Sequence, residues 1–405
     1  MRVLLSVCGS RGDVEPLAAL AVRLQEFGAE TLMCAPPDEE FVKRLAEVGV
    51  TSVPAGVPVR DFVERARSRP VKRFSETVAE VLAAQYEAVD AVAEGCDLVV
   101  ATGLMPSSAA ARSVADKRGI PYVLTVYCPW VLPSPYHPPF SYPGRPLPQD
   151  VTDNRVLWEL DRENMNAVFG GPVNAHRTSI GLPAVESVRD HVFTDRPLLA
   201  ADAALAPWRR PADLGAVQTG AWVLPDDRPL PPDLMAFLDA GTPPVYVGFG
   251  SMSTDALKDA SRAAIEAVRG HGRRAVVSRG WADLGLIDDR DDCFPVGEAN
   301  HHALFGRVAA VIHHGGAGTT TKAALAGAPQ VVVPQLADQP YWGRRLADLG
   351  VGAVLDGPVP TAGALSTALE TALAPETRSR ATALAGEIRT DGASTAARLL
   401  LDMIG

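Results

Sequence analysis

Apolar and polar positions in the first forty residues follow the order strand, turn, helix, strand. The stretch Arg2–Cys8 is largely apolar, which is typical of a strand buried on both faces of a parallel sheet. After a glycine-containing turn, apolar residues recur at helical spacing from Leu17 to Phe27, and Gly28 ends the pattern. Further strands are predicted at residues 31–35, 98–102 and 122–127.

The alternation stops in the proline-rich stretch from Leu205 to Pro232 and resumes beyond it. We expect residues 205–232 to link an N-terminal domain, residues 1–204, to a C-terminal domain, residues 233–389. A last helix, following a kink at Gly392, is expected to place residues 390–405 back on the N-terminal domain. The fold class is therefore α/β, with two Rossmann-like, doubly wound domains facing a central cleft. In the second half, strands are predicted at 244–248, 273–278, 293–296, 307–313 and 330–334, and helices at about 254–270, 319–327 and 340–349.

Composition narrows the range of partners. The 405 residues carry a net charge of −10, which argues against nucleic acid, because no basic stripe is present to neutralise a phosphate backbone. The first apolar run is interpreted as a strand and not as a signal peptide, and no run approaches the roughly 20 residues that cross a bilayer. We expect a cytoplasmic protein that binds no membrane. The cysteines are scattered without C-x-x-C spacing, which disfavours disulfides and zinc: Cys8, Cys34, Cys96, Cys128 and Cys293.

The strongest motif lies between a predicted strand that ends near Ile312 and a helix expected to begin near Thr319. Its glycines allow a ligand to approach the backbone, and the amides at a helix start favour anions. His314 is interpreted as a donor to a diphosphate that would bind better when protonated, whereas His313 is interpreted as a packing residue. Thr319 or Thr320 is expected to cap the helix or to donate to phosphate. The proposed cradle consists of His314, Gly315, Gly316, Ala317, Gly318 and Thr319.

A second glycine turn, Gly9–Asp13, occupies the equivalent place in the first half. Ser10 and Arg11 are expected to point toward the cleft, where Arg11 supplies a cation. Asp13 has two interpretations: the N-cap of the following helix, or a general base that takes a proton from an acceptor hydroxyl. The residues alone favour the cap.

These motifs together resemble glycosyltransferase family 1, and specifically the bacterial enzymes that glycosylate vancomycin-group glycopeptide antibiotics. The resemblance covers nearly the whole chain and is carried by MRVLLSVCGSRGDVEPLAALAVRL, AVQTGAWVLPDDRPL, VYVGFGS, SRGWADL, VGEANHHALFGRVAAVIHHGGAGTTT, GAPQVVVPQLADQPY and IRTDGASTAARLLLD. It implies the GT-B fold, an N-terminal acceptor-binding domain and a C-terminal donor-binding domain. It also implies an inverting hexosyl transfer without metal or other cofactor, from a UDP- or dTDP-sugar.

The resemblance assigns roles residue by residue. Asp13 becomes the acceptor-activating base, and Ser10 and Arg11 lie near the donor phosphates. Ser251 corresponds to a further phosphate contact, and Val296 with Gly297 to the backbone edge that reads the base. Asp338 and Gln339 correspond to the pair that binds sugar hydroxyls. Trp281 is either a base-stacking or a core residue. Asn300 and His301 replace the Trp–Gln pair of plant relatives, so their base recognition is not carried over.

The acceptor side is sought in the proline-rich segment 127–148. Tyr127, Trp130 and Tyr136 are expected to wall a hydrophobic cleft for a bulky aromatic or peptide natural product. The neighbouring His137, Phe140 and Tyr142 belong to the same segment, which is otherwise interpreted as a stiff surface loop. The basic stretch 60–73 is interpreted as a solvated face, including Arg65, Arg67, Arg69 and Lys72.

Other patterns are set aside. The D-x-D string at 288–292 is interpreted as a solvated acidic turn and not as a metal site. Two alternatives to a monomeric transferase remain: a nucleotide-sugar 2-epimerase of the same fold, and a catalytically silent partner that activates a sister enzyme. The acceptor hydroxyl is expected to be phenolic, because an ordinary carboxylate is a weak base. Glucose is the first expectation for the sugar.

Overall fold

The computed structural model describes residues 1–59, 61, 74–141, 145–209, 211, 214–250, 255–280, 288 and 290–405, with backbone only for Phe74 and residues 255–258. Its contacts divide the chain into two compact units. Unit 1 comprises Met1–Asp202, Pro207–Leu224 and Thr390–Gly405, and unit 2 comprises Ala203–Ala206 and Pro225–Arg389.

The sheet of unit 1 has seven strands in the order β3-β2-β1-β4-β5-β6-β7, and every pair is parallel. The predicted strand Arg2–Cys8 is β1, and its apolar side chains are buried on both faces, as the uninterrupted pattern required. The other strands are β2 (Glu30–Ala35), β3 (Ser52–Pro54), β4 (Leu98–Gly103), β5 (Tyr122–Val126), β6 (Leu198–Leu199) and β7 (Val217–Gln218).

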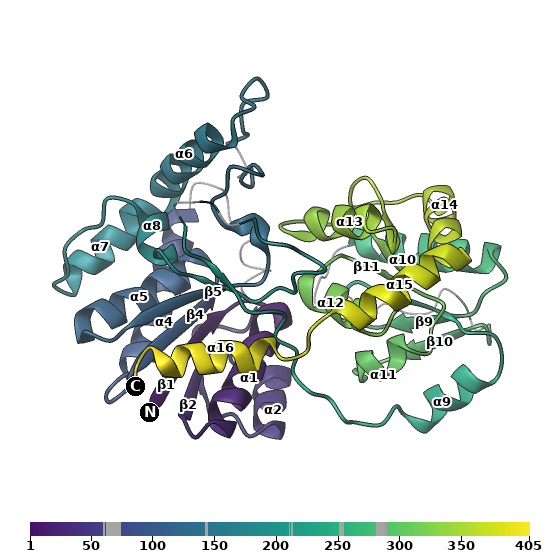
Figure 1. Ribbon diagram of the computed structural model, residues 1–405, viewed down its shortest axis with the longest axis horizontal. Coiled ribbons are helices and arrows are strands. Elements are labelled where there is room, and N and C mark those ends of the chain that lie inside the picture. The colour runs from purple at the N-terminus through teal and green to yellow at the C-terminus, as the bar shows by residue number, and fades with distance from the viewer. Residues whose placement is uncertain are drawn as a thin grey trace. The chain divides into compact units, whose positions relative to one another are not determined.

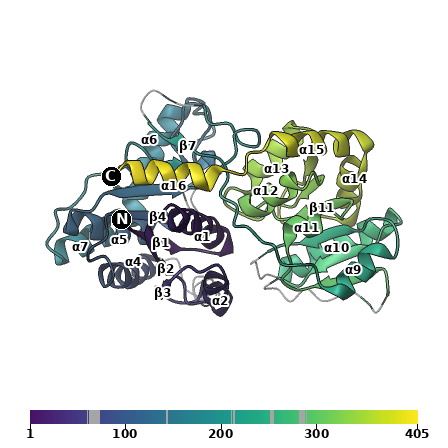
Figure 2. The ribbon, with the colours of Figure 1, turned by 60° about the horizontal axis from the view of Figure 1, so that its bottom comes forward.

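Helices cover both faces of this sheet (Figure 1). Right-handed crossovers send the chain in opposite directions from β1, so α1 (Arg11–Glu26) and α5 (Met105–Arg118) lie on opposite faces. The C-terminal helix α16 (Gly392–Asp402) packs along α1, and α4 (Phe74–Asp90) packs along α5 (Figure 2). Unit 1 also contains α2 (Glu39–Glu47), η2 (Pro129–Val131), α6 (Asn154–Met165), η3 (Asn166–Gly170), α7 (Gly171–Ser179) and α8 (Val188–Phe193).

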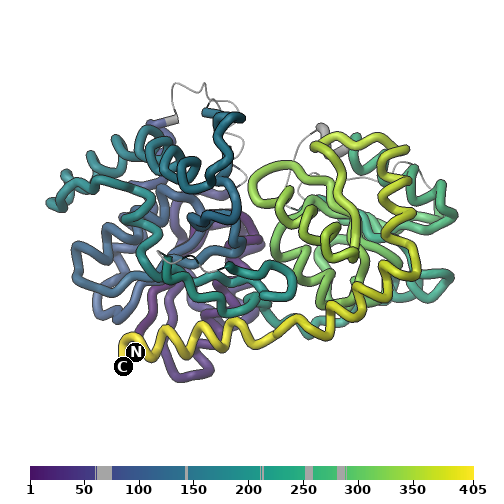
Figure 3. The backbone as a smooth tube through the Cα atoms, turned by 45° about the horizontal axis from the view of Figure 1, so that its top comes forward, coloured from purple at the N-terminus to yellow at the C-terminus, as the bar shows by residue number. Residues whose placement is uncertain are grey.

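The stretch 205–232, expected to be a linker, is instead built into the units. β7 extends the unit 1 sheet, and the Trp222 indole nitrogen donates to the Thr219 hydroxyl at 3.0 Å. Gly392 is not a kink, because it begins α16 and its Cα lies against Gly220. Both chain termini end in unit 1, side by side (Figure 3).

The sheet of unit 2 has six parallel strands in the order β10-β9-β8-β11-β12-β13. They are β8 (Val245–Gly248), β9 (Ala275–Ser278), β10 (Cys293–Val296), β11 (Ala310–His313), β12 (Gln330–Val332) and β13 (Gly352–Val354). The helices are α9 (Pro232–Asp239), α10 (Asp255–Gly270), α11 (His301–Phe305), α12 (Ala317–Leu325), α13 (Gln339–Asp348), α14 (Ala362–Leu373) and α15 (Pro375–Glu387).

Side chains along β8 alternate between two apolar cores, as the two-residue period of a strand requires. Val245 and Val247 pack with α10 and α14 on one face, whereas Tyr246 packs with α9, α11 and α12 on the other. From the neighbouring strands β8 and β11 the chain continues in opposite directions, so the space beyond their carboxyl ends is the switch point where such sheets bind ligands.

Candidate active site

The loops after β8 and β11 meet at the switch point of unit 2. Gly250, at φ 64°, lies so near the His314 ring that a Cβ atom on it would stand 2.8 Å from Cε1. A Cβ atom on Gly316 would stand 2.5 Å from Nε2 of the same ring. Glycine at both positions therefore leaves the space that the imidazole occupies.

The His314 ring is a neutral imidazole. Burial lowers its pKa from 6.5 to about 4, so at neutral pH the ring carries no charge and lacks the stronger binding expected of its protonated form. Its Nδ1 is buried without a hydrogen-bond partner among the described residues. A neutral ring still has one N–H that can donate a hydrogen bond.

Helix α12 begins at Ala317, two residues before the expected start. Its N-cap is Gly316, and no described side chain caps it, so neither Thr319 nor Thr320 is the cap. The first-turn amides of Ala317, Gly318 and Thr319 have no intrahelical acceptor, and the first turn holds no acidic residue. An uncapped, partially positive helix end is suited to an anion.

Gly315 does not contribute its amide to this cradle, which corrects the sequence-based expectation. Its N–H donates to His313 Nδ1 at 3.1 Å, toward the sheet. Its φ of 90° and its packing against Val332 and Gln339 explain the glycine. The loop also brings Gln339 next to the cradle.

Asp338 and Gln339 lie at the start of α13, but both side chains are already engaged. The Trp342 indole donates to Asp338 Oδ2 at 2.8 Å, and burial raises the pKa of this carboxyl. Gln339 Oε1 accepts from the amides of Gln335 and Leu336 at 2.7 and 3.1 Å. Ala337, which directly precedes Asp338, has φ 54°, a conformation that non-glycine residues rarely adopt.

The base-reading edge is predicted at Val296 and Gly297; Val296 is the last residue of β10 and Gly297 follows it. The Val296 carbonyl accepts from the Arg279 amide at 3.1 Å, whereas Gly297 is exposed. Asn300 and His301 have structural contacts: Asn300 caps α11, and His301 stacks on Phe305 with ring centroids 4.9 Å apart. Ser251 and Trp281 lie outside the described residues.

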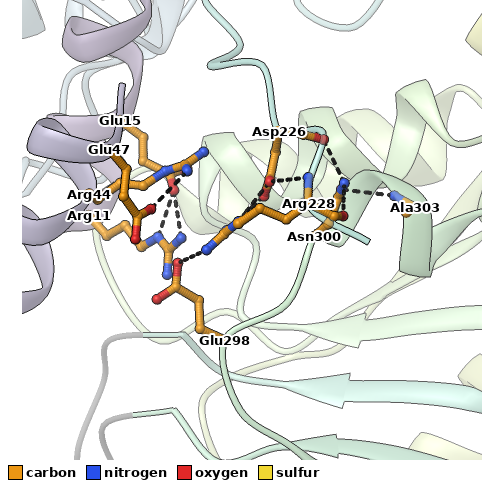
Figure 4. Close-up of polar contacts among 9 residues, drawn as sticks. All are labelled: Arg11, Glu15, Arg44, Glu47, Asp226, Arg228, Glu298, Asn300 and Ala303. Carbon is orange, nitrogen blue, oxygen red and sulfur yellow. Dashed lines mark hydrogen bonds and ion pairs between the residues drawn. The ribbon is translucent and has the colours of Figure 1, made fainter. Parts of the chain in front are cut away.

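A charged cluster that sequence reasoning missed joins residues 226–228 to residues 298–300, which follow β10 (Figure 4). Arg228 contacts Asp226 at 2.7 Å and Glu298 at 3.1 Å. Asn300 donates to the Asp226 and Arg228 carbonyls at 2.6 and 3.1 Å. The adjacent DDR triplet is a weak signal, because charged turns usually face solvent.

In unit 1, the first glycine turn leads directly into α1. Ser10 is the N-cap and accepts from the Gly12 amide at 3.3 Å, so the capping interpretation of Asp13 is wrong. Arg11 forms an ion pair with Glu15 at 2.7 Å (Figure 4). The half-buried Asp13 carboxylate lies over Gly9, where a Cβ atom would stand 2.2 Å from Oδ2.

The residues expected to form the acceptor wall divide into two kinds. Tyr127 does not present its hydroxyl to a ligand, because it donates to the Asp13 carbonyl at 3.0 Å and holds the first turn of α1. Trp130 donates to the Pro138 carbonyl at 2.8 Å and packs on Phe140, and Tyr136 is exposed. Tyr142 and the stretch 60–73, Asp61 excepted, lie outside the described residues.

The acidic turn at 288–292 is not simply solvated. Arg269 contacts both Asp288 and Asp292 at 2.7 Å and lowers the pKa of each carboxyl. Within the described ranges, no group of three or more His, Cys, Asp or Glu residues is arranged to hold a metal ion. No helix in this part of the chain is both long and apolar enough to span a bilayer.

Known proteins resemble the chain over its whole length. It is 57% identical over 404 residues to the vancomycin aglycone glucosyltransferase of Amycolatopsis orientalis, covering 100% of this chain and 98% of that one. The chain belongs to the vancomycin-group glycosyltransferases. A second glycosyltransferase of this group, the dTDP-epi-vancosaminyltransferase of the same organism, is 53% identical over 408 residues, again covering 100% and 98%.

Domain models and solved structures agree with membership of this glycosyltransferase group. Residues 3–136 match the glycosyltransferase family 28 N-terminal domain, and residues 294–397 match the C-terminal domain of erythromycin biosynthesis protein CIII-like proteins. The glycosyltransferase of kitacinnamycin has a TM-score of 0.75 at 19% identity, covering 100% of this chain and 99% of that one. The glycosyltransferase VinC in complex with dTDP has a TM-score of 0.67 at 22% identity, with the same coverage. The fold is therefore GT-B.

Proposed function

We propose that this glycosyltransferase moves a hexose, with inversion, from a UDP- or dTDP-sugar to a phenolic hydroxyl of a glycopeptide aglycone. The observation that carries the proposal is the uncapped N-terminus of α12 with the His314 imidazole held against it by two glycines. Relatives named for transfer to the vancomycin aglycone and for dTDP-epi-vancosamine support the acceptor class and the donor class.

The leaving group is a nucleoside diphosphate, whose departure places negative charge on the phosphate oxygens. In our proposal, the amides of Ala317, Gly318 and Thr319 and one N–H of His314 receive that charge. Because these donors are fixed before the reaction, they stabilise the transition state without a large reorganisation. We assign the sugar hydroxyls to Asp338 and Gln339, at the start of α13, in addition to the contacts that these side chains make within the protein.

The acceptor must lose a proton as its oxygen attacks the anomeric carbon. We assign the base to Asp13, because Ser10 and not Asp13 caps α1. A carboxylate suits a phenol, whose proton is more acidic than that of an alkyl alcohol. The C–O bond to the diphosphate breaks as the new glycosidic bond forms, so a single displacement inverts the configuration.

The test is a panel of UDP- and dTDP-sugars, incubated with a glycopeptide aglycone and analysed by mass and by anomeric configuration. We expect one hexose added per aglycone, UDP- or dTDP-glucose among the best donors, and inverted stereochemistry. Retention of configuration, or interconversion of the nucleotide sugar without any transfer, would overturn the proposal.

We also propose that transfer requires no metal and that the protein acts as a monomer. Extensive dialysis against EDTA should leave the turnover unchanged, because the amides and the imidazole stabilise the negative charge of the leaving diphosphate that a divalent ion would otherwise neutralise. A loss that Mg²⁺ or Mn²⁺ restores would contradict this. Light scattering at assay concentration should give the mass of one chain.

A further inference from the structure

A chain of buried polar groups lies behind the loop that leads to α12. His313, the last residue of β11, Gln330, the first residue of β12, and Thr320 of α12 are each fully buried. His313 Nε2 lies 2.9 Å from Gln330 Oε1, and Gln330 Nε2 lies 3.3 Å from the Thr320 carbonyl oxygen. Together with the hydrogen bond from the Gly315 amide to His313 Nδ1, these contacts connect the loop, strands β11 and β12, and helix α12.

The direction of each hydrogen bond follows from elementary chemistry. The Gly315 N–H is only a donor, so Nδ1 of His313 must be the acceptor. The proton of the neutral ring therefore resides on Nε2, which donates to Gln330 Oε1. The Gln330 amide group then faces the Thr320 carbonyl as a donor. Each of the three hydrogen bonds thus pairs one donor with one acceptor. Burial lowers the pKa of His313 to about 3, so the ring stays neutral and these donor and acceptor roles hold at neutral pH.

These hydrogen bonds fix the backbone of Gly315, the residue between His314 and the start of α12. In the sequence Gly315 separates His314 from Gly316, so the direction of its backbone influences the placement of the His314 ring and of the start of α12. Gln330 holds the second turn of α12 against β12 through the Thr320 carbonyl. Loss of the Gln330 amide would leave a buried donor on His313 and one bond to a carbonyl unmade, which costs more than a hydrogen bond on the surface.

We infer that His313 and Gln330 are positioning residues for the donor diphosphate: acting through Gly315 and Thr320, they aim His314 and the α12 amides at the phosphates. The inference rests on the proposed function of the α12 cradle. It assigns a functional role to His313, which the sequence indicated only as packing, and to Gln330, which the sequence did not single out.

The test compares the affinities of the full-length protein for a nucleoside and for its diphosphate, by calorimetry with uridine and UDP and with thymidine and dTDP. The dissociation constant of the nucleoside divided by that of the diphosphate measures how much the phosphates contribute to binding. Gln330→Met keeps the length of the side chain but removes both polar groups. We expect it to lower the ratio about tenfold, equivalent to about 1.4 kcal/mol, with unchanged nucleoside affinity.

Two changes at His313 sharpen the test. Asn carries Oδ1 on Cγ, where histidine carries Nδ1. His313→Asn therefore keeps an acceptor for the Gly315 amide and should retain most of the wild-type preference for the diphosphate over the nucleoside. His313→Leu offers no acceptor and should lower this preference as Gln330→Met does. Val331→Ala is the matched control, because Val331 is buried in the core on the α10 and α14 face. It should lower the melting temperature without changing the ratio.

The outcomes separate this inference from the proposed function. A wild-type protein that binds the diphosphate no better than the nucleoside overturns the cradle and, with it, the inference. A wild-type preference for the diphosphate that survives unchanged in Gln330→Met and His313→Leu overturns the inference alone. If His313→Leu does not fold, Gln330→Met and His313→Asn decide the question.

Discussion

At the scale of single residues, neighbouring positions with similar chemistry have different roles, and local geometry decides between them. Ser10 and Asp13 are both good N-cap residues, and the residues alone favour Asp13 as the cap of α1. The helix starts one turn earlier than expected and Ser10 takes the cap. The role of Asp13 as a base remains a prediction.

Replacement of Asp13 by asparagine tests that role. We expect Asp13→Asn to lower turnover about 10²–10⁴-fold, the usual contribution of a general base, because the amide cannot accept the proton. Nucleotide affinity, measured by calorimetry, should not change. Glu26→Gln, at the far end of the same helix, is the control and should leave turnover intact. Undiminished turnover in Asp13→Asn would remove this residue as the base.

The adjacent histidines show the same limit of sequence reasoning. Both lie at the carboxyl end of β11, and successive side chains of an extended strand point in opposite directions. His313 therefore enters the polar chain below the loop, whereas His314 lies between Gly250 and Gly316. The sequence distinguished their directions but not the protonation state of His314, which depends on burial.

The two rings predict an acid sensitivity of unit 2. Their folded-state pKa values, about 3 and about 4, lie below the unfolded value of 6.5, so protons bind the unfolded chain more tightly. Stability is fully present above pH 6.5 and is lost as pH falls toward 4, by up to about 1.4 kcal/mol per pH unit for each ring. Hydrogen exchange of unit 2 amides at pH 7.5 and 5.5 should show this loss, with a shallower dependence in His314→Ala. Equal slopes would contradict the buried, neutral state of His314.

At the scale of elements, strands were easier to predict than helix starts. Strands Arg2–Cys8 and Cys293–Val296 match the expectation because their apolar runs end at polar or glycine residues. Helix α12 was expected near Thr319 because threonine is a good cap, yet the helix begins at Ala317 behind an uncapped glycine. A helix end without a capping side chain departs from capping preferences, so those preferences misplace it.

Proline at the first helical position gives a direct test of these amides. Ala317→Pro removes one N–H, and proline is tolerated at this position of a helix. The preceding Gly316, at φ −63° and ψ 142°, already has the conformation that a following proline requires. We expect UDP and dTDP affinity to fall up to about tenfold with little change in melting temperature. Ala362→Pro, at the first position of α14, controls for the substitution itself; equal affinities in both variants would exclude the Ala317 amide from binding.

At the scale of the whole molecule, periodicity identified two doubly wound sheets but not their edges. β7 has two residues and lies in a proline-rich stretch, so no pattern distinguished it from a linker. Its place depends on pairing with β6, which is equally short. The packing of α16 on α1 agrees with the expected return of residues 390–405 to the N-terminal domain.

Gly392 tests how much unit 1 depends on this returning helix. A Cβ atom there would stand 2.5 Å from the Ala221 carbonyl oxygen and from the Gly220 carbonyl carbon, both backbone atoms that cannot move aside cheaply. We expect Gly392→Ala to destabilise unit 1 by about 1–3 kcal/mol, the usual cost of overpacking. Hydrogen exchange should show faster opening of α1, with α10 unaffected. Gly386→Ala, where a Cβ atom meets no neighbour, is the control; identical protection in both variants would contradict the close approach.

Because unit 1 contains both Met1–Asp202 and Thr390–Gly405, unit 2 is, apart from Ala203–Ala206, an insert between Leu224 and Thr390. A hybrid that joins the first half of one relative to the second half of another at a single junction would bring a foreign C-terminal helix onto the native α1. Exchange of sugar specificity between relatives therefore calls for two crossover points, one on each side of the insert, so that α1 and α16 stay with the parent in which they were matched.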